Sequence, residues 1–357
     1  MTAALALFFA TAAPLAPVMA DPPRQQLLRW QVDPIRCGAR RVTPLAPIRP
    51  LSGLVWGKAD PQAITFTFRI DATGRALSIA QTPKRYAPSS EDLGPALAAA
   101  RFTPGETLAD CAVTYHAEAV PFARADPVEL MAYTLDPISG RLPREGWDRI
   151  MPPGSDCLRP PYSKPLLTAF PDYDRIPGTP GERSWSMTGY DLTAKGRPVN
   201  VRTVAGTANA PLDAAARKAV AASRFTAGAR TGCLLPHSRA ATPLPAPVAP
   251  EEASFGAKPN CPAAPWAQPP RLTYPRPWNR RSIEGWAVVT YDVAPWGEVG
   301  NVRVLASEPA EAFGEQAMQV VRSARRAPSP TGASGCIDRV MFKIRPTNEP
   351  ADAEAVE

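Results

Sequence analysis

Histidine is scarce in this chain, and its scarcity limits the chemistry that the protein can perform. Only His116 and His237 occur among the 357 residues, and no CxxC or CxxH pair is present. The ligand spacing of a structural zinc site is therefore missing, and no pairing of a nucleophile with a base repeats along the chain. A glycine-rich phosphate loop is also absent. We expect no enzymatic activity, no metal site and no cofactor.

Long apolar runs are missing too, apart from one at the N-terminus. Residues 1–20 form an Ala/Leu/Phe-rich run that ends in Val18-Met19-Ala20, a small-residue cleavage pattern. This pattern predicts a secretory signal peptide cut after Ala20. The run has no Lys or Arg before it and is long enough to leave a retained membrane anchor as the alternative. Pro14 and Pro17 favour cleavage, because they disfavour a spanning helix.

Acidic residues are outnumbered by basic ones, 33 against 40, so the formal net charge is +7. For an exported protein, this balance favours anionic lipid, lipopolysaccharide or an acidic protein as the partner, and not nucleic acid. The alternative is that the arginine-rich helices only present solvent-exposed faces that bind no partner.

The six cysteines fall into three pairs of nearly equal span: Cys37 and Cys111, Cys157 and Cys233, and Cys261 and Cys336. An even number of cysteines in an exported chain favours disulfides, and a similar short sequence recurs inside each pair. We therefore predict one disulfide within each repeat. Closing a loop of about 75 residues should stabilise each module by about 4 kcal/mol.

The second and third repeats share a Trp-x4-Tyr-Asp-apolar-x3-Gly-x3-Asn-Val-Arg pattern. Its members are Trp185, Tyr190, Asp191, Leu192, Gly196, Asn200, Val201 and Arg202 in one copy, and Trp286, Tyr291, Asp292, Val293, Gly297, Asn301, Val302 and Arg303 in the other. The first copy is more diverged but keeps Phe68, Ile70, Gly74 and Ile79 in matching positions. The sequence therefore predicts one module present three times.

The third copy shows the order of elements most clearly. Residues 286–293 alternate between two faces, as in a β-strand, and Gly297 is expected at a positive φ in the turn to a second strand at 302–304. Apolar residues at helical spacing follow over 313–324, and 337–345 alternate again. The module is therefore strand, hairpin turn, strand, helix, strand.

The second copy departs from this order after its second cysteine. Only Leu234 and Leu235 separate Cys233 from Pro236, so its closing strand is expected to be short or missing. Residues 123–156 fit no copy and are one candidate to fill the open sheet edge. Asp191 and Asp292 lie beside the turns, where a carboxylate more often caps a hairpin than catalyses.

We therefore predict an α+β protein of three tandem modules, each a small antiparallel sheet packed on a helix. The prolines, 45 in all, cluster at 153–180, 236–250 and 262–277, as expected of extended connectors and of the segments that lead into a module. The predicted parts are a signal peptide (1–20), module 1 (37–122), a connector (123–156), module 2 (157–235), a Pro/Ala-rich linker (236–260), module 3 (261–346) and an acidic tail (347–357).

The third copy resembles the C-terminal domain of the TonB family, the energy transducers of the Gram-negative envelope. The motifs that carry the resemblance are Tyr274-Pro275, Ile283-Glu284-Gly285-Trp286, Tyr291-Asp292-Val293 with Gly297, Val302-Arg303-Val304 and Phe342-Lys343-Ile344. The resemblance is weaker at 170–233, where Phe170-Pro171 replaces Tyr-Pro, and weakest at 47–120. It implies a domain that binds a short transporter segment as an added strand at the sheet edge. This chain differs from the family in having three copies, a disulfide in each and no evident anchor.

The resemblance leads us to expect a non-enzymatic periplasmic protein that binds an envelope protein, such as an outer-membrane transporter, through a sheet edge. The alternatives are a TonB-like energy transducer anchored in the inner membrane and facing the periplasm, and a structural protein that binds peptidoglycan or a lipid surface. The edge residues expected to bind the partner are Ile337, Arg339, Val340, Met341, Phe342, Lys343 and Ile344.

Overall fold

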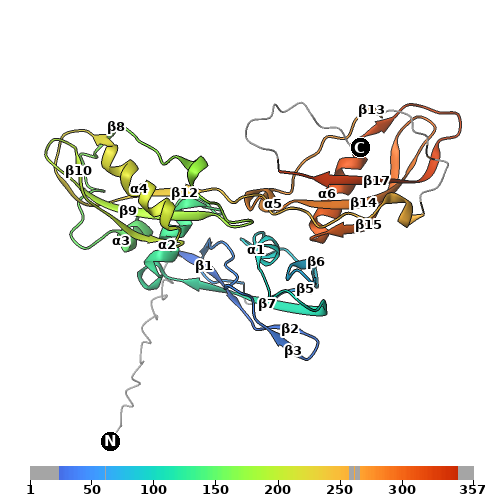
Figure 1. Ribbon diagram of the computed structural model, residues 1–357, viewed down its shortest axis with the longest axis horizontal. Coiled ribbons are helices and arrows are strands. Elements are labelled where there is room, and N and C mark those ends of the chain that lie inside the picture. The colour runs from blue at the N-terminus through green and yellow to red at the C-terminus, as the bar shows by residue number, and fades with distance from the viewer. Residues whose placement is uncertain (1–23, 61, 257–260, 262–265, 345–357) are drawn as a thin grey trace, which may run out of the picture.

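The computed structural model describes residues 24–60, 62–256, 261 and 266–344. The predicted signal peptide and acidic tail lie outside these residues. Within the described part of the chain, no helix combines the length and the apolar character that a bilayer crossing requires. We refer below to region 1 (24–122), region 2 (157–239) and region 3 (261–344). Region 2 lies at the upper left of Figure 1, region 3 at the upper right and region 1 below them.

Region 1 forms a seven-stranded sheet in which β5 pairs with both β6 and β7. Its elements are β1 (Gln25–Val32), β2 (Ile35–Cys37), β3 (Arg40–Val42), β4 (Gly53–Trp56), β5 (Ile64–Ile70), β6 (Ala76–Gln81), α1 (Leu93–Ala99), β7 (Leu108–Val120) and the short η1 (Phe122–Arg124). The sheet therefore includes residues upstream of the predicted module, since β1 and β2 both pair with β7.

Regions 2 and 3 each contain a three-stranded sheet, ordered β10-β9-β12 and β15-β14-β17. The elements of region 2 are β8 (Pro165–Leu167), η2 (Tyr173–Arg175), β9 (Ser184–Leu192), β10 (Pro198–Gly206), α4 (Ala210–Ala222), β11 (Arg224–Phe225) and β12 (Arg230–Arg239). The 3-10 helix η3 (Glu252–Phe255) precedes region 3, whose elements are β13 (Trp266–Gln268), α5 (Arg276–Arg280), β14 (Gly285–Val293), β15 (Val299–Glu308), α6 (Glu311–Arg322), β16 (Arg325–Arg326) and β17 (Ala333–Phe342). In each region the first hairpin strand is central, and a helix separates the second strand from the closing strand.

One backbone contact recurs at the hairpin turn of every region. A glycine there has φ between 69° and 89°, and a Cβ added to it would lie 2.1 Å from a carbonyl oxygen of the segment after the helix. Its own carbonyl accepts a hydrogen bond from that same residue at 2.9–3.0 Å. The glycines are Gly74, Gly196 and Gly297, and the residues that they contact are Phe102, Phe225 and Arg326. Only glycine fits this position, which explains its recurrence in all three copies.

The three predicted disulfides are present and each lies within its own repeat. Their sequence separations are 74, 76 and 75 residues. In each case the second cysteine lies on the closing strand, at Cys111 in β7, Cys233 in β12 and Cys336 in β17. Each disulfide therefore fastens an upstream segment beside the closing strand.

The closing strand of region 2 is complete, so the prediction of a short or missing strand was wrong. β12 runs to Arg239, which lies opposite Ser184 of β9. Pro236 suggested an early end because proline cannot donate a hydrogen bond to a neighbouring strand. An edge strand such as β12 tolerates proline where the missing N–H would face away from its neighbour.

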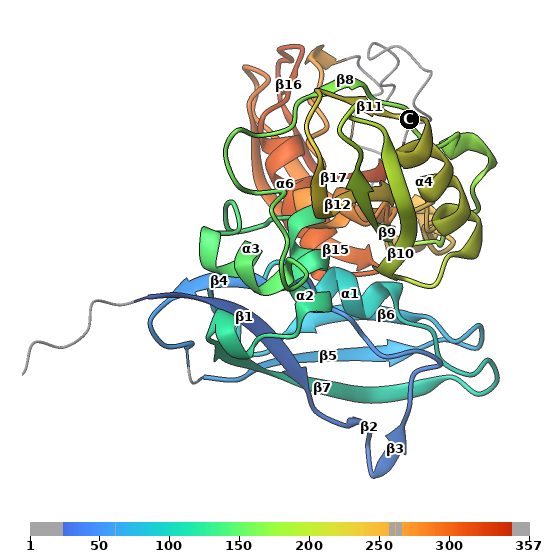
Figure 2. The same cartoon turned by 90° about the vertical axis from the view of Figure 1, so that its left-hand side faces the viewer.

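Residues 123–156 add no strand to a sheet edge, although Ser155 and Asp156 at their end donate hydrogen bonds to β12. Most of the connector forms two helices, α2 (Pro127–Leu135) and α3 (Arg144–Ile150), which pack against sheet residues of both flanking regions. The shared apolar cluster contains Leu27 and Val120 from region 1, Leu130, Met131 and Ile150 from the connector, and Trp185 and Met187 from region 2. Figure 2 shows α2 between the sheet of region 1 and region 2.

Regions 1 and 3 also pack directly against each other. Ile79 of β6 donates its N–H to the carbonyl of Pro309 at 2.9 Å. Glu308 accepts hydrogen bonds from the N–H of Ser78 at 2.6 Å and from Arg69 Nη2 at 2.8 Å. Apolar residues of both regions belong to one cluster, so the two regions form a continuous body.

A buried ion pair lies where the three regions meet. Arg281 Nε and Nη2 donate to the two carboxylate oxygens of Asp92 at 2.6 and 2.5 Å. Arg281 also donates to the carbonyls of Arg49 in region 1 and Gly181 in region 2, at 2.9 and 3.4 Å. Asp92 is fully buried and Arg281 nearly so.

The described part of the Pro/Ala-rich linker lies along region 3. Leu244 forms a parallel bridge with Ile283, and the Trp286 indole donates to the carbonyl of Pro247 at 3.0 Å. These residues therefore form part of the folded body, whereas the sequence indicated an extended connector.

Candidate strand-addition site

The closing strand β17 lies at the edge of the sheet in region 3. It pairs with β14 alone, in an unbroken antiparallel register from Gly285 opposite Phe342 to Tyr291 opposite Cys336. Among the described residues, no backbone–backbone hydrogen bond reaches the other side of β17 between Ile337 and Phe342. This stretch is therefore a regular strand with one edge free of backbone pairing, although the linker lies near it and the Arg339 side chain donates to the carbonyl of Pro250 at 3.5 Å.

The predicted edge residues occupy two different places. Five lie within β17: Ile337, Arg339, Val340, Met341 and Phe342. Lys343 and Ile344 lie beyond its end, where both bind Glu284: Lys343 Nζ is 3.0 Å from Oε2, and the Ile344 N–H donates to Oε1 at 3.1 Å. These contacts fix the end of β17 against the start of β14, so the last two residues anchor the strand.

Val340 and Phe342 are core residues, whereas Ile337, Arg339 and Met341 are partly exposed. The Phe342 ring packs edge-on against Phe313 of α6 at 5.2 Å between centroids. Two of the predicted residues therefore hold the strand in the domain and cannot contact a partner through their side chains.

Equivalent positions in the other two regions show which backbone groups of β17 face outward. The third residue after the second cysteine is Thr114 in region 1, Pro236 in region 2 and Arg339 in region 3. The carbonyl of Thr114 accepts from Asp33 at 2.9 Å, on the side away from β5, and Pro236 has no N–H to give to β9. Along a strand, the N–H and C=O groups of successive residues point alternately toward one neighbouring strand and toward the other side. The N–H and C=O groups of Ile337, Arg339 and Met341 therefore point away from β14.

The equivalent edge in region 1 is already occupied by the chain itself. β1 pairs antiparallel with β7 from Leu27 opposite Val120 to Val32 opposite Tyr115, and β2 continues the pairing at Cys37 opposite Cys111. Region 1 thus contains a strand added at the position that is unpaired in β17. This strand was not predicted because the repeat pattern begins only at Cys37, although the apolar residues Leu28, Trp30 and Val32 alternate with polar ones as in a strand.

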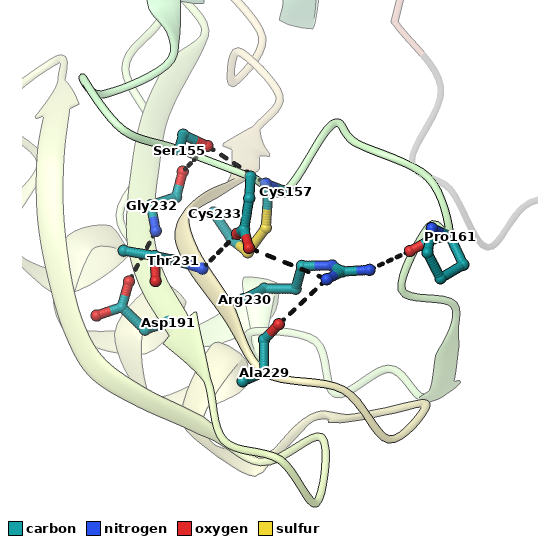
Figure 3. The surroundings of a disulfide bond; sticks show 10 residues. Ser155, Cys157, Pro161, Asp191, Ala229, Arg230, Thr231, Gly232 and Cys233 are labelled. Atoms are coloured by element: carbon teal, nitrogen blue, oxygen red, sulfur yellow. Dashed lines mark hydrogen bonds and ion pairs between the residues drawn. A yellow bond between two sulfur atoms is a disulfide. The ribbon is translucent and has the colours of Figure 1, made fainter.

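In region 2 the corresponding edge is partly covered. The N–H of Asp156 donates to the carbonyl of Thr231 at 3.2 Å, and Ser155 Oγ donates to that of Gly232 at 3.0 Å. Figure 3 shows this segment beside the disulfide between Cys157 and Cys233. Farther along β12, Pro236 removes one outward donor.

The opposite edge of region 3, β15, is less suited to accept a strand. Its pairing with β14 shifts register twice, between Val288 and Val289 and between Thr290 and Asp292. Such bulges twist an edge and interrupt its row of hydrogen-bonding groups. β15 also ends at Glu308, which region 1 binds.

The repeated aspartates support the fold of the hairpins. Asp292 accepts hydrogen bonds from Asn301 Nδ2 at 2.7 Å and from the N–H of Gly335 at 2.8 Å. Asp191 makes the same two contacts, with Asn200 and Gly232, at 2.8 and 2.7 Å. The hydrogen bond from Asn200 holds the pKa of the Asp191 carboxyl below its usual range. Both carboxylates are therefore committed to joining the hairpin to the closing strand.

The two histidines are far apart in the fold. His116 lies on β7, with Nε2 3.1 Å from Asp33 Oδ2, and His237 is buried in β12 of another sheet. Across the residues that the structure describes, no cluster of three or more His, Cys, Asp or Glu side chains could hold a metal ion.

Region 3 also matches known proteins. Residues 270–346 match the family model described as Gram-negative bacterial TonB protein C-terminal. The curated Protein TonB of Escherichia coli (strain K12) is 37% identical over 76 residues, which make up 21% of this chain and 31% of that protein. The chain thus spans about a third of the length of this relative. The solution NMR structure of the Pseudomonas aeruginosa TonB CTD is 23% identical, with a TM-score of 0.22, over 25% of this chain and 95% of that one.

The match covers one of the three regions, and the case for three copies rests on the recurring sequence, glycine contact and strand order. The residues matched include β14, β15 and β17 in full. Residues 270–346 of this chain are thus similar to the C-terminal domain of TonB proteins.

Proposed function

We propose that this protein is a non-enzymatic periplasmic binding protein built from three modules of the TonB C-terminal type. Its β17 edge takes up a strand from an envelope protein, such as an outer-membrane transporter. The observation that carries this proposal is the regular, unpaired edge of β17 within a domain similar to that of TonB. Strand addition gains affinity from main-chain hydrogen bonds. The outward backbone N–H and C=O groups of Ile337, Arg339 and Met341 are placed to make them.

The experiment compares Arg339→Pro with Arg339→Ala in the full chain. Both variants lose the arginine side chain, but only the proline variant also loses the outward N–H. Region 2 has a proline at the equivalent position, so Arg339→Pro should fold. The probes are synthetic peptides from the periplasmic segments of outer-membrane transporters, measured by titration calorimetry.

We expect Arg339→Pro to bind the peptides about tenfold more weakly than Arg339→Ala, because one main-chain hydrogen bond is lost and the proline ring obstructs the edge. Amide hydrogen exchange supplies a second measurement. Peptide binding should protect the outward amides of Ile337, Arg339 and Met341, while those of Asp338 and Val340 are protected beforehand by β14. Equal binding by the two variants, or no alternating protection, would refute the edge model.

The main alternative is an energy transducer anchored in the inner membrane, favoured by the identity with Protein TonB. The two are separated by the N-terminal peptide, identified by mass in periplasmic and inner-membrane fractions. A soluble chain that begins at Asp21 supports the periplasmic binding protein, and a membrane-bound chain that retains Met1 supports the transducer. A structural role in binding peptidoglycan would instead give co-sedimentation with purified sacculi that is equal for Arg339→Pro and Arg339→Ala.

A further inference from the structure

A short segment of region 2 exposes four large apolar side chains. Tyr162, Leu166, Leu167 and Phe170 are 60%, 70%, 56% and 70% exposed. We call residues 159–170, which contain them, the strap. Exposed apolar residues are ordinary when they occur singly, but several in one place mark an interaction surface.

The strap is held in place by its backbone, so these side chains cannot be buried by a small local adjustment. β8 pairs with β11 along Arg224 and Phe225. The carbonyl of Lys164 accepts a hydrogen bond from the N–H of Thr226 at 2.9 Å, and the backbone N–H of Ala169 donates to Ser223 Oγ at 3.1 Å. Exposure of the apolar side chains is therefore fixed by the fold.

The start of the strap is fastened separately. Arg230 donates to the carbonyl of Pro161, and the disulfide between Cys157 and Cys233 holds the preceding residues against β12. Figure 3 shows both fastenings.

The equivalent segment of region 3 turns its aromatic residues inward. Tyr274, which corresponds to Phe170, packs edge-on against Phe342 at 5.7 Å between centroids and donates to the carbonyl of Ile283 at 2.6 Å. Trp266 of β13, the counterpart of β8, stacks on Tyr291 at 6.1 Å. Outward aromatic and aliphatic side chains therefore distinguish region 2 and are not inherent in the module.

The charges on the strap have one sign. Residues 157–170 contain Arg159 and Lys164 and no acidic residue, and both cations are exposed. The acidic residue nearest to each end of this stretch has a cationic neighbour: Asp156 lies 3.9 Å from Arg230, and Asp172 lies 3.1 Å from Arg175. Apolar side chains next to unpaired cations suit the boundary between head groups and acyl chains of an anionic membrane.

We propose that the strap docks region 2 onto the surface of an anionic phospholipid bilayer. Leu166, Leu167 and Phe170 enter the boundary between head groups and acyl chains, and Arg159 and Lys164 lie against the lipid phosphates. Figures 1 and 2 place β8 at the end of region 2 that lies away from the sheet of region 1, where a flat surface can reach it. This contact is independent of strand addition at β17.

The test is co-sedimentation of the full chain with vesicles of phosphatidylglycerol and phosphatidylcholine, and with vesicles of phosphatidylcholine alone. We expect binding to the anionic vesicles only. The double variant Leu166→Ser/Leu167→Ser should bind about tenfold more weakly, because it removes two inserted side chains. Lys164→Glu should weaken binding by a similar factor at low salt, and this difference should vanish at about 0.5 M salt because of screening.

Val248→Ser is the matched control, since Val248 is an exposed apolar residue outside the strap. It should bind as the unsubstituted protein does. All substituted residues are exposed, so the unfolding temperatures of the variants should agree. The proposal is overturned by failure to bind anionic vesicles, by equal binding to the neutral ones, by unchanged binding of the double variant, or by an equal loss in Val248→Ser. It is also overturned if sedimentation velocity finds a dimer that the double variant abolishes, because the strap would then join two copies of the chain.

Discussion

Removing one partner of the buried ion pair between Arg281 and Asp92 should strongly destabilise the protein. In Asp92→Asn, the side chain can still accept from the N–H of Leu51, now bound at 2.7 Å, but the buried Arg281 loses the one carboxylate that it contacts and keeps only the weaker attraction of Glu182 and Asp136. Loss of one member of a buried pair costs about 3–5 kcal/mol. This is a large fraction of the total stability of a typical domain, about 5–15 kcal/mol.

Urea denaturation, followed by circular dichroism and tryptophan fluorescence at neutral pH, measures the loss. The control is Asp148→Asn, which removes the exposed pair between Arg144 and Asp148 on α3 and should cost less than about 1 kcal/mol. Arg281→Met combined with Asp92→Asn removes both charges, so the double variant should be more stable than Asp92→Asn alone.

The reasoning fails if Asp92→Asn costs no more than the exposed control. The pair would then be solvated in solution, and regions 1, 2 and 3 would not meet around Arg281. It fails equally if the loss of stability in the double variant equals the sum of the losses in Asp92→Asn and in Arg281→Met measured singly, because partners in a buried pair must show a coupling energy.

Three further predictions concern single regions. Replacing Cys157 and Cys233 by alanine should lower the stability of region 2 by about 4 kcal/mol, as measured by urea denaturation, because the disulfide closes a loop spanning 76 residues; an unchanged midpoint would contradict this. Gly297→Ala should cost about 2 kcal/mol or more in unfolding free energy, since the φ of Gly297 is 89° and an added Cβ would lie 2.1 Å from a carbonyl oxygen. Gly300→Ala, where an added Cβ meets open space, should be nearly neutral. Equal losses in the two variants would disprove the turn geometry. Burial lowers the pKa of His237, so the folded state binds a proton at this histidine less readily than the unfolded state does. The contribution of His237 to stability is therefore present above a pH of about 6.5 and declines as the pH falls below that value. His237→Gln should flatten this pH dependence in thermal unfolding, and an identical pH profile would exclude the histidine as its cause.

The sequence predicted the parts of the fold that depend on local pattern. Alternation over 286–293 and helical spacing over 313–324 correspond to β14 and α6. Gly297 was identified because it alone of the nearby glycines recurs, and its tight contact with a backbone carbonyl explains that recurrence. The cysteine pairing followed from spacing and is confirmed.

The parts that the sequence did not predict depend on contacts between distant segments. Pro236 suggested the end of a strand, because nothing local shows that its missing N–H faces an open edge. β1 was missed because its partner β7 lies some 90 residues away, at Leu27 opposite Val120. The joining of the regions through Arg281 was equally invisible, since an arginine in sequence resembles any other surface cation until its burial is known.

At the candidate site, the alternation over 337–345 predicted the strand and the shared face of Val340 and Phe342. It did not show that the backbone N–H and C=O groups of Arg339 and Met341 face the open edge. That assignment needed Thr114 and Pro236 as references in the other regions.

The three closing strands have consequences for valency. The first is filled by β1, the second is partly covered and lacks a donor at Pro236, and the third is unpaired along its regular stretch. Repetition of the module therefore does not multiply the binding positions. A peptide that adds to a closing strand should saturate this protein at one per chain, so any gain in avidity must come from association of chains or from a second kind of surface.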